Sequence, residues 1–161
     1  MSLFELKKGQ IFIVDVKELR KYRLIAEVEG KLIIPMEPDD GRLFFDKKGN
    51  LFICEGQRRR VVSIDPQGKV TVLAERYKNG RFNKPNDLWV DPKGGVYFSD
   101  PYYGREKPTL EQDGEHVYYI SPDRKSVIRV ADDLVRPNGL IGTADGKLLY
   151  IADHGGDKTF V

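Results

Sequence analysis

Short apolar runs recur along the chain, each after a turn that contains glycine and each ending in an acidic residue. They lie at residues 9–15, 49–55, 94–100 and 146–153. Their length and their content of Val, Ile, Phe and Tyr, between residues such as Gly, Pro and Asp, are typical of β-strands. They recur at intervals of about 40 to 50 residues, which indicates a repeat architecture.

Further strand-like runs fill each interval. They lie at residues 43–45, 88–90 and 140–141 before the acid-ended runs, and at residues 61–64, 70–74, 117–120 and 126–130 after them. Four short strands in each repeat predict the antiparallel meander of a β-propeller blade. A helical repeat is the alternative, since residues 17–28 have helix propensity. However, 9 Pro and 16 Gly leave little room for helices of normal length.

The sequence therefore predicts an all-β fold, an incomplete β-propeller of about three to three and a half blades that forms a single domain over residues 1–161. The blades are expected at residues 1–40, 41–85 and 86–137, with a truncated one, ending after two strands, at residues 138–161. Closed propellers have 4–8 blades. The chain is therefore expected to belong to a longer polypeptide or to complete its ring as a homodimer.

The order of strands in a blade places candidate site residues at one rim. The first strand runs away from the loop that leads into the blade, and the second strand returns to it. Asn86 should therefore lie near Asp100, and Asn138 near Asp153. Because first strands line the axis of a propeller, this rim would surround the mouth of the central channel.

Two of the leading loops share the pattern Pro-Asn-x-Leu, at residues 85–88 and 137–140. Pro-Asn is common turn chemistry, in which Asn closes an Asx-turn before a strand. Alternatively, the side chains of Asn86 and Asn138 converge on the axis with nearby carboxylates to hold Ca²⁺, which takes 6–8 oxygen ligands. The pattern alone leaves both interpretations open.

Residues 100–115 form the longest stretch without a predicted strand and belong to the same rim. Loops of this length often carry function. Tyr102 and Tyr103 in this loop either cap a small polar ligand or pack against the next blade.

Charge and composition exclude several classes of function. The 161 residues include 27 Lys and Arg against 25 Asp and Glu, a net charge of +2, which predicts no binding to nucleic acid or to an anionic membrane. No apolar run approaches the roughly 20 residues of a membrane span. No signal peptide is visible, so we expect a cytoplasmic location. The single Cys54 neither requires nor excludes export.

Four segments together resemble a known family. They are residues 73–77 (Leu-Ala-Glu-Arg-Tyr), 83–88 (Asn-Lys-Pro-Asn-Asp-Leu), 97–104 (Tyr-Phe-Ser-Asp-Pro-Tyr-Tyr-Gly) and 136–140 (Arg-Pro-Asn-Gly-Leu). The family is the gluconolactonase/regucalcin (senescence marker protein) superfamily, in its gluconolactonase branch. The resemblance implies a six-bladed, calcium-dependent lactonase of which this chain covers about half. Plant strictosidine synthase-like propellers share the Asn-Asp-Leu and Tyr-Phe-Ser-Asp elements but fit the linking segments less well.

The resemblance also implies a site. In that superfamily a divalent metal is held by a Glu, by the two Pro-Asn asparagines and by a later Asp, so that Asn86 and Asn138 would be ligands of Ca²⁺ or another divalent metal. When the register of the repeat is extended back from Gly41, the position of the family's Glu coincides with Met1 of this chain. The family's later Asp, the expected general base, would lie beyond Val161. The residues expected to shape the pocket for a small-molecule lactone are Glu55, Asp87, Asp100, Tyr102 and Tyr103.

The implied reaction is the ring opening of a sugar lactone. Because the charged groups of the family's site fall outside the matched positions, the resemblance leaves open both an active and an inactive partial chain. The alternative from a different class is a non-catalytic propeller segment, an interaction module that presents its rim or its open blade edges to a partner.

Overall fold

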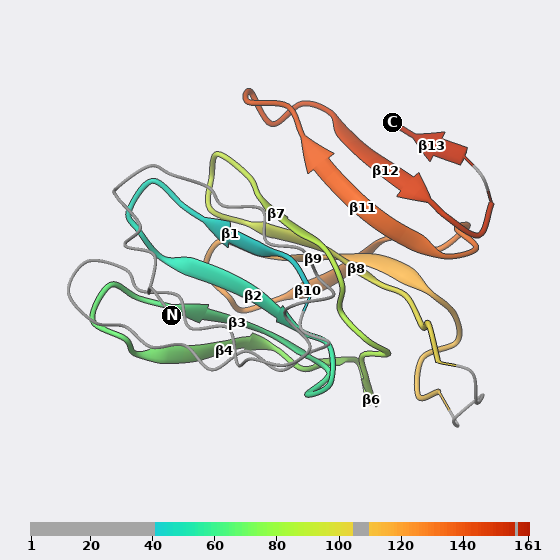
Figure 1. The fold of residues 1–161 in the computed structure, drawn as a ribbon, viewed down its shortest axis with the longest axis horizontal. Coiled ribbons are helices and arrows are strands. Elements are labelled where there is room, and N and C mark those ends of the chain that lie inside the picture. The colour runs from blue at the N-terminus through green and yellow to red at the C-terminus, as the bar shows by residue number, and fades with distance from the viewer. Residues whose placement is uncertain (1–40, 105–109, 157) are drawn as a thin grey trace, which may run out of the picture.

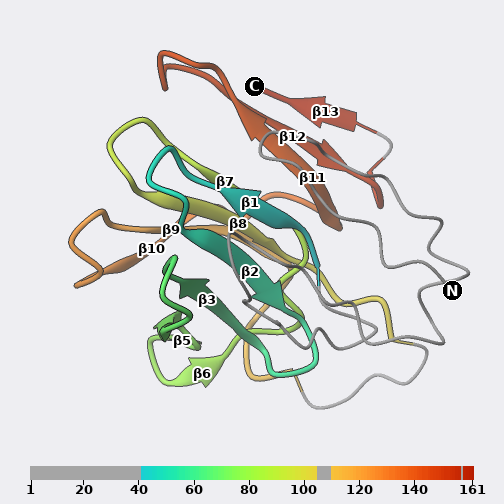
Figure 2. The same ribbon diagram turned by 60° about the vertical axis from the view of Figure 1, so that its left-hand side comes forward.

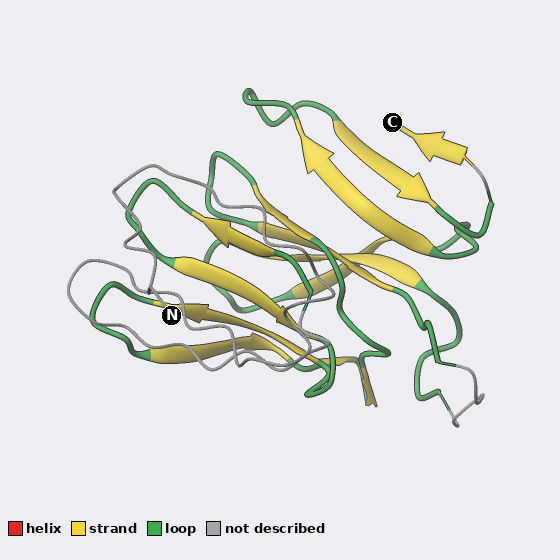
Figure 3. Cartoon of the chain, in the orientation of Figure 1, coloured by secondary structure: helices red, strands yellow, loops and turns green. Residues whose placement is uncertain are grey.

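The computed structural model describes residues 41–104, 110–156 and 158–161, and the strands found there form successive antiparallel sheets (Figures 1 and 3). The first sheet has the order β1-β2-β3-β4, with β1 Leu43–Phe45, β2 Leu51–Glu55, β3 Arg60–Ile64 and β4 Val70–Ala74. The second has β7 Leu88–Val90, β8 Val96–Asp100, β9 His116–Ile120 and β10 Val127–Ala131 in sequential order. The third has β11 Pro137–Gly142, β12 Leu149–Asp153 and β13 Lys158–Phe160.

Tight turns of the type Asp-x-x-Gly set the register of the first two strands in a blade. In the β7–β8 turn, Oδ1 of Asp91 accepts the backbone N–H groups of Lys93 and Gly95 at 2.7 and 2.9 Å. Gly94 has a φ of 90°, a conformation in which a side chain would be strained. This turn pairs Leu88 with Phe98, and that register brings the residues before β7 to the end of β8.

Buried aromatic side chains fill the space between the first and second sheets. Phe82, Phe98 and Tyr118 are fully buried, and the rings of Phe82 and Phe98 meet edge to face with centroids 4.9 Å apart. A second group, with Val117, Leu140 and Ile151 at its centre, packs between the second and third sheets. Each sheet therefore buries a face against its neighbour, as blades of a propeller do.

The first strands of the three sheets lie side by side. Strand β7 contacts β1 on one side and β11 on the other, and both ribbon views place the β7–β8 pair between the first and third sheets (Figures 1 and 2). The loops leading into neighbouring blades therefore meet at one rim, which positions the candidate site.

The all-β prediction is confirmed, because no helix occurs in the described ranges. The prediction that the last blade ends after two strands is wrong, since β13 pairs with β12 through Ile151 and Phe160. A small hairpin of β5 Arg76–Tyr77 and β6 Gly80–Arg81 was not predicted from the sequence. The expected blade at residues 1–40 and the candidate helix at residues 17–28 lie outside the described residues. In the part of the chain that the structure covers, no helix could span a membrane.

Candidate functional site

The two Pro-Asn motifs meet at the rim between the second and third sheets. Nδ2 of Asn86 donates a hydrogen bond of 2.8 Å to Oδ1 of Asn138. Asn86 lies two residues before β7, and Asn138 is the second residue of β11; both are half-buried. The expected convergence of the two asparagines is confirmed, whereas their role as metal ligands stays a prediction.

Two open cavities adjoin this pair. One of about 280 Å³ is lined by Gly41, Arg42, Asn86, Asp87, Asn138 and Gly139. The other, of about 520 Å³, shares Asn138 and Gly139 with the first and is lined also by Asp153, His154 and Lys158. Asn138 lines both cavities, whereas Asn86 lines only the smaller one, so a small molecule in the smaller cavity would be within reach of both asparagines.

The acids that end the second strands hold the leading loops. The carboxylate of Asp100 accepts the backbone N–H groups of Asn83 and Lys84, each at 2.8 Å. The carboxylate of Asp153 does the same for Val135 and Arg136, at 2.9 and 2.6 Å. In both blades the acid therefore binds the backbone just before the Pro-Asn dipeptide.

The two acids are at equivalent positions, but their pKa values shift in opposite directions. Burial raises the pKa of Asp100 to about 7, although the amides of Asn83 and Lys84 act to lower it. Burial also acts to raise the pKa of Asp153, but the backbone amides of Val135, Arg136, Gly155 and Gly156 together bring it below the ordinary value. The carboxylate of Asp153 is therefore stabilised as an anion by amide hydrogen bonds.

Asp87 connects three sheets. Its Oδ2 accepts the backbone N–H of Leu140 in β11 at 2.8 Å, and its Oδ1 accepts that of Leu88 in β7 at 2.8 Å. Nε of Arg42, just before β1, lies 2.8 Å from the same Oδ1. Burial raises the pKa of Asp87, opposed by these amides and by the Arg42 guanidinium. The contacts of Asp87 and Asp100 all lie within the protein, and their contact with substrate stays a prediction.

Glu55 ends β2 at the same level of the first sheet. It forms ion pairs with Arg58, at 3.1 Å, and with Nε of Arg60, and only 8% of its surface is exposed. Asp100 and Asp153, at the equivalent positions, bind the backbone that leads into their own blades. For Glu55, the corresponding residues lie outside the described part of the chain. The substrate-binding role of Glu55 also stays a prediction.

The tyrosine loop contacts the next blade. The Arg136 guanidinium carbon lies 5.7 Å from the Tyr103 ring centroid, and Nε of Arg136 is 3.5 Å from Oε2 of Glu115. The same glutamate oxygen accepts the backbone N–H of Tyr102 at 2.9 Å. The interpretation that the tyrosines pack against the next blade therefore has support for Tyr103, whereas the backbone of Tyr102 is bound within its own blade. Tyr103, 41% exposed, is still accessible to a ligand.

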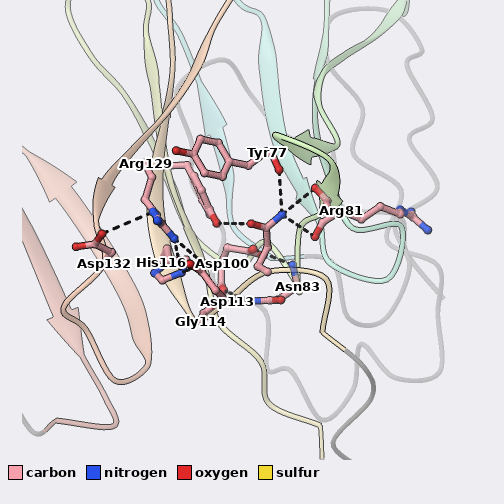
Figure 4. Close-up of polar contacts among 12 residues, drawn as sticks. Tyr77, Arg81, Asn83, Asp100, Asp113, Gly114, His116, Arg129 and Asp132 are labelled. Atoms are coloured by element: carbon pink, nitrogen blue, oxygen red, sulfur yellow. Dashed lines mark hydrogen bonds and ion pairs between the residues drawn. The ribbon is translucent and has the colours of Figure 1, made fainter.

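Sequence reasoning missed three residues that support the site. Asn83 donates its Nδ2 to the backbone oxygens of Asp100 and Gly114, at 3.1 and 2.8 Å (Figure 4). Ser99 donates its hydroxyl to the backbone oxygen of Asn138 at 2.6 Å. Gln112 donates to backbone oxygens of the β5–β6 hairpin. Only Asn83 and Ser99 carried a signal, because they lie within the motifs that suggested the family.

The described residues fit part of a calcium site. Two amide oxygens are suitable ligands for a hard cation, but Ca²⁺ needs further oxygen ligands, carboxylates among them. Over residues 41–104, 110–156 and 158–161, no three His, Cys, Asp or Glu side chains are grouped so that they could hold a metal ion. The nearby carboxylates of Asp87, Asp100 and Asp153 already accept backbone amides, so the remaining charge would have to come from other residues or another chain.

The fold and the repeated loops define a partial β-propeller, as the sequence predicted. The family described as SMP-30/Gluconolactonase/LRE-like region matches residues 3–160, and the chain belongs to this family. The streptogramin B lyase structure, at 11% identity, shares the fold with a TM-score of 0.54 over 73% of this chain and 35% of that one.

Curated relatives and solved structures carry lactonase names. The chain is 32% identical to a gluconolactonase from Zymomonas mobilis over 122 residues, which are 73% of this chain and 34% of that protein. It is 28% identical to the lactonase drp35 of Staphylococcus saprophyticus over 95% of this chain and 44% of the relative. The Xanthomonas campestris gluconolactonase XC5397 matches with a TM-score of 0.64 and 35% identity, over 71% and 40% of the two chains. The chain thus spans less than half the length of these relatives.

Proposed function

We propose that this chain forms the asparagine side of a calcium-dependent lactone hydrolase site that opens sugar lactones of the gluconolactone type. The observation that carries the proposal is the 2.8 Å contact between Asn86 and Asn138, which brings matching Pro-Asn motifs of two blades together beside open cavities. Membership of the lactonase family and the lactonase names of its relatives support the reaction class.

In the proposed reaction, the oxygen of a water molecule bonds to the lactone carbonyl carbon, the ring C–O bond breaks, and the ring oxygen takes up a proton to give a hydroxy acid. Bound Ca²⁺ would supply the positive charge that polarises the carbonyl. Asn86 and Asn138 would hold this cation through their amide oxygens. The general base that takes the proton from water would come from outside the described residues.

The pocket wall would come from the same rim. Tyr103 and Arg136 lie together beside the loop that carries Asn138, and the exposed face of the tyrosine ring offers an apolar surface for a sugar ring. Tyr102, whose backbone is tied to Glu115, and Glu55 on the neighbouring blade would contribute to the same wall.

For the 161-residue chain by itself, we propose that a second copy supplies the facing blades, because the chain spans less than half the length of its relatives. Apolar side chains of the third sheet and of its β11–β12 turn support a partner: Ile141, Leu148 and Tyr150 are 63%, 46% and 38% exposed. Light scattering tests this directly, since a dimer is expected and a monomer at all concentrations would contradict it.

The function is tested by following acid release from D-glucono-δ-lactone in the presence of CaCl₂ or of excess chelator. We expect hydrolysis above the spontaneous rate only with calcium, and its loss in Asn86→Ala and Asn138→Ala. Asn79→Ala, an exposed asparagine of the β5–β6 turn, is the matched control. Hydrolysis equal to the spontaneous rate in every condition would contradict an active lactonase and favour a non-catalytic interaction module.

A further inference from the structure

We infer that Asp100 and Asp153 are positioning residues, whose carboxylates fix the two loops that deliver Asn86 and Asn138 to each other. The consequence for catalysis rests on the proposed function, whereas the positioning rests on the geometry alone. Neither acid contacts the asparagine side chains in the structure; each acts through the backbone that precedes one of them.

The first observation is that the same contact occurs in two blades. Asp100 binds the backbone N–H groups two and three residues before Asn86, and Asp153 binds those two and three residues before Asn138. Both carboxylates are almost completely buried, with 0% and 2% of their residues' surface exposed. The bonds of Asp153, whose anion is stabilised by backbone amides, are charge-assisted, which makes them stronger than bonds between neutral groups.

The second observation is that these bonds join distant parts of the chain, whereas the backbone amides bound by the turn acid Asp91 are local; its other oxygen accepts the hydroxyl of Tyr119. Asp91 binds amides two and four residues further along, within its own turn at the opposite end of the blade. Asp100 and Asp153 bind amides 16 to 18 residues away, and Asp153 also binds the nearby amides of Gly155 and Gly156. A bond to a neighbouring residue shapes a turn, whereas the long-range bonds fix the position of a separate loop relative to the end of a strand.

The third observation is that the preceding blade holds the other side of each asparagine. The backbone oxygen of Asn86 accepts the N–H of Arg42 at 2.7 Å, and that of Asn138 accepts the hydroxyl of Ser99 at 2.6 Å. Each asparagine therefore lies between a carboxylate of its own blade and a donor of the blade before it. The side-chain amide of each asparagine then faces the other asparagine.

The test uses NMR spectra of the full chain in which the side-chain amide groups of asparagine are assigned. In Asp153→Asn, one acceptor oxygen becomes an amide donor, so we expect the Asn138 side-chain signals to shift. In Asp100→Asn, we expect the Asn86 signals to shift for the same reason. The control is Asp91→Asn, which also loses a carboxylate that binds two backbone amides but should leave both asparagines unchanged.

Alanine at position 153 would remove both acceptors and can prevent folding, so the substitutions to asparagine decide the question. If Asp153→Asn does not fold, Asp153→Glu keeps the charge while moving the carboxylate by one methylene, and a shift of the Asn138 signals is again expected. The inference is overturned if the variants at 100 and 153 fold with a lower melting temperature than the parent chain, but their Asn86 and Asn138 signals match those of the Asp91→Asn control.

A second readout separates this inference from the proposed function. With CaCl₂ as the probe, calcium-induced shifts of the asparagine signals in Asp153→Asn should need at least about tenfold more calcium than in the parent chain, as for residues that orient metal ligands. If the parent chain shows no calcium response while the variants still shift the asparagines, the positioning stands and the metal proposal fails.

Discussion

Asn86 and Asn138, 52 residues apart in the sequence, are joined by a side-chain hydrogen bond of 2.8 Å between Nδ2 of the first and Oδ1 of the second. They occupy the same position in successive repeats. Their contact therefore shows how the second and third sheets are positioned relative to each other, and it brings together the side chains of the two repeated Pro-Asn motifs.

The two asparagines should be energetically coupled. In a double-mutant cycle of Asn86→Ala and Asn138→Ala, we expect the free energy of unfolding to show a coupling of about 0.5–1.5 kcal/mol, because either substitution alone already removes the shared hydrogen bond. Urea unfolding of the four proteins measures this. Additive effects, within the error of the cycle, would show that the bond contributes nothing in solution.

Asp87 should matter much more to stability than its ion-pair partner. Asp87→Ala leaves the buried N–H of Leu140 without its acceptor, and we expect a loss of about 1–3 kcal/mol. The Arg42 side chain is 63% exposed, so that Arg42→Ala should cost no more than about 1 kcal/mol. Chemical denaturation of both variants makes the comparison, and equal losses would mean that the ion pair dominates.

The two loop-holding acids should give opposite dependences of stability on pH. The folded pKa of Asp100, about 7, lies above the ordinary value of 3.8, so the folded chain binds more protons than the unfolded chain between these values. Its contribution to the free energy of unfolding therefore falls as pH rises from about 4 to about 7. The folded pKa of Asp153 lies below the ordinary value, so its contribution is present above about pH 4 and is lost as pH falls through the folded pKa.

Unfolding measured across this range for the parent chain, Asp100→Asn and Asp153→Asn tests both signs. The stability advantage of the parent chain over Asp100→Asn should shrink toward neutral pH. Its advantage over Asp153→Asn should shrink toward acid pH instead. Parallel curves for either pair would contradict the corresponding pKa shift.

The aromatic contact between the first two sheets should be central to folding. Phe82 is fully buried against Phe98 and Tyr118, so Phe82→Ala should cost about 3–5 kcal/mol. The same substitution at Phe45, which is 48% exposed, is the control and should cost much less. Similar losses at both positions, measured by denaturant unfolding, would show that the two sheets do not depend on this packing.

The repeat could be predicted from sequence because its signals are local. An Asp-x-x-Gly turn between two apolar runs fixes the register of the first two sheets, as in the pairing of Leu88 with Phe98. In the third sheet, a turn from Thr143 to Gly146 precedes the pairing of Leu140 with Ile151. The same register brought the two Pro-Asn motifs to one rim. Strand β13 was missed because its three residues, Lys158–Phe160, have no apolar alternation of their own and pair only where β12 offers an edge.

The contacts of the acids could not be predicted in the same way. An acid at the end of a strand can face a pocket or bind a backbone, and the choice depends on a loop that precedes it by 16 to 18 residues. The β5–β6 hairpin was missed for a similar reason. Its backbone oxygens are held by Gln112, more than 30 residues further along the chain, which no local pattern reveals.

The most direct test of a shared cation site is a titration of the full chain with CaCl₂, followed through the side-chain amide signals of its asparagines. If the two asparagines bind one cation, the signals of Asn86 and Asn138 shift together with one common calcium dependence, while those of Asn79 do not move. A common site would be contradicted if millimolar calcium left the side-chain signals of Asn86 and Asn138 unchanged. It would also be contradicted if the two residues responded at different calcium concentrations.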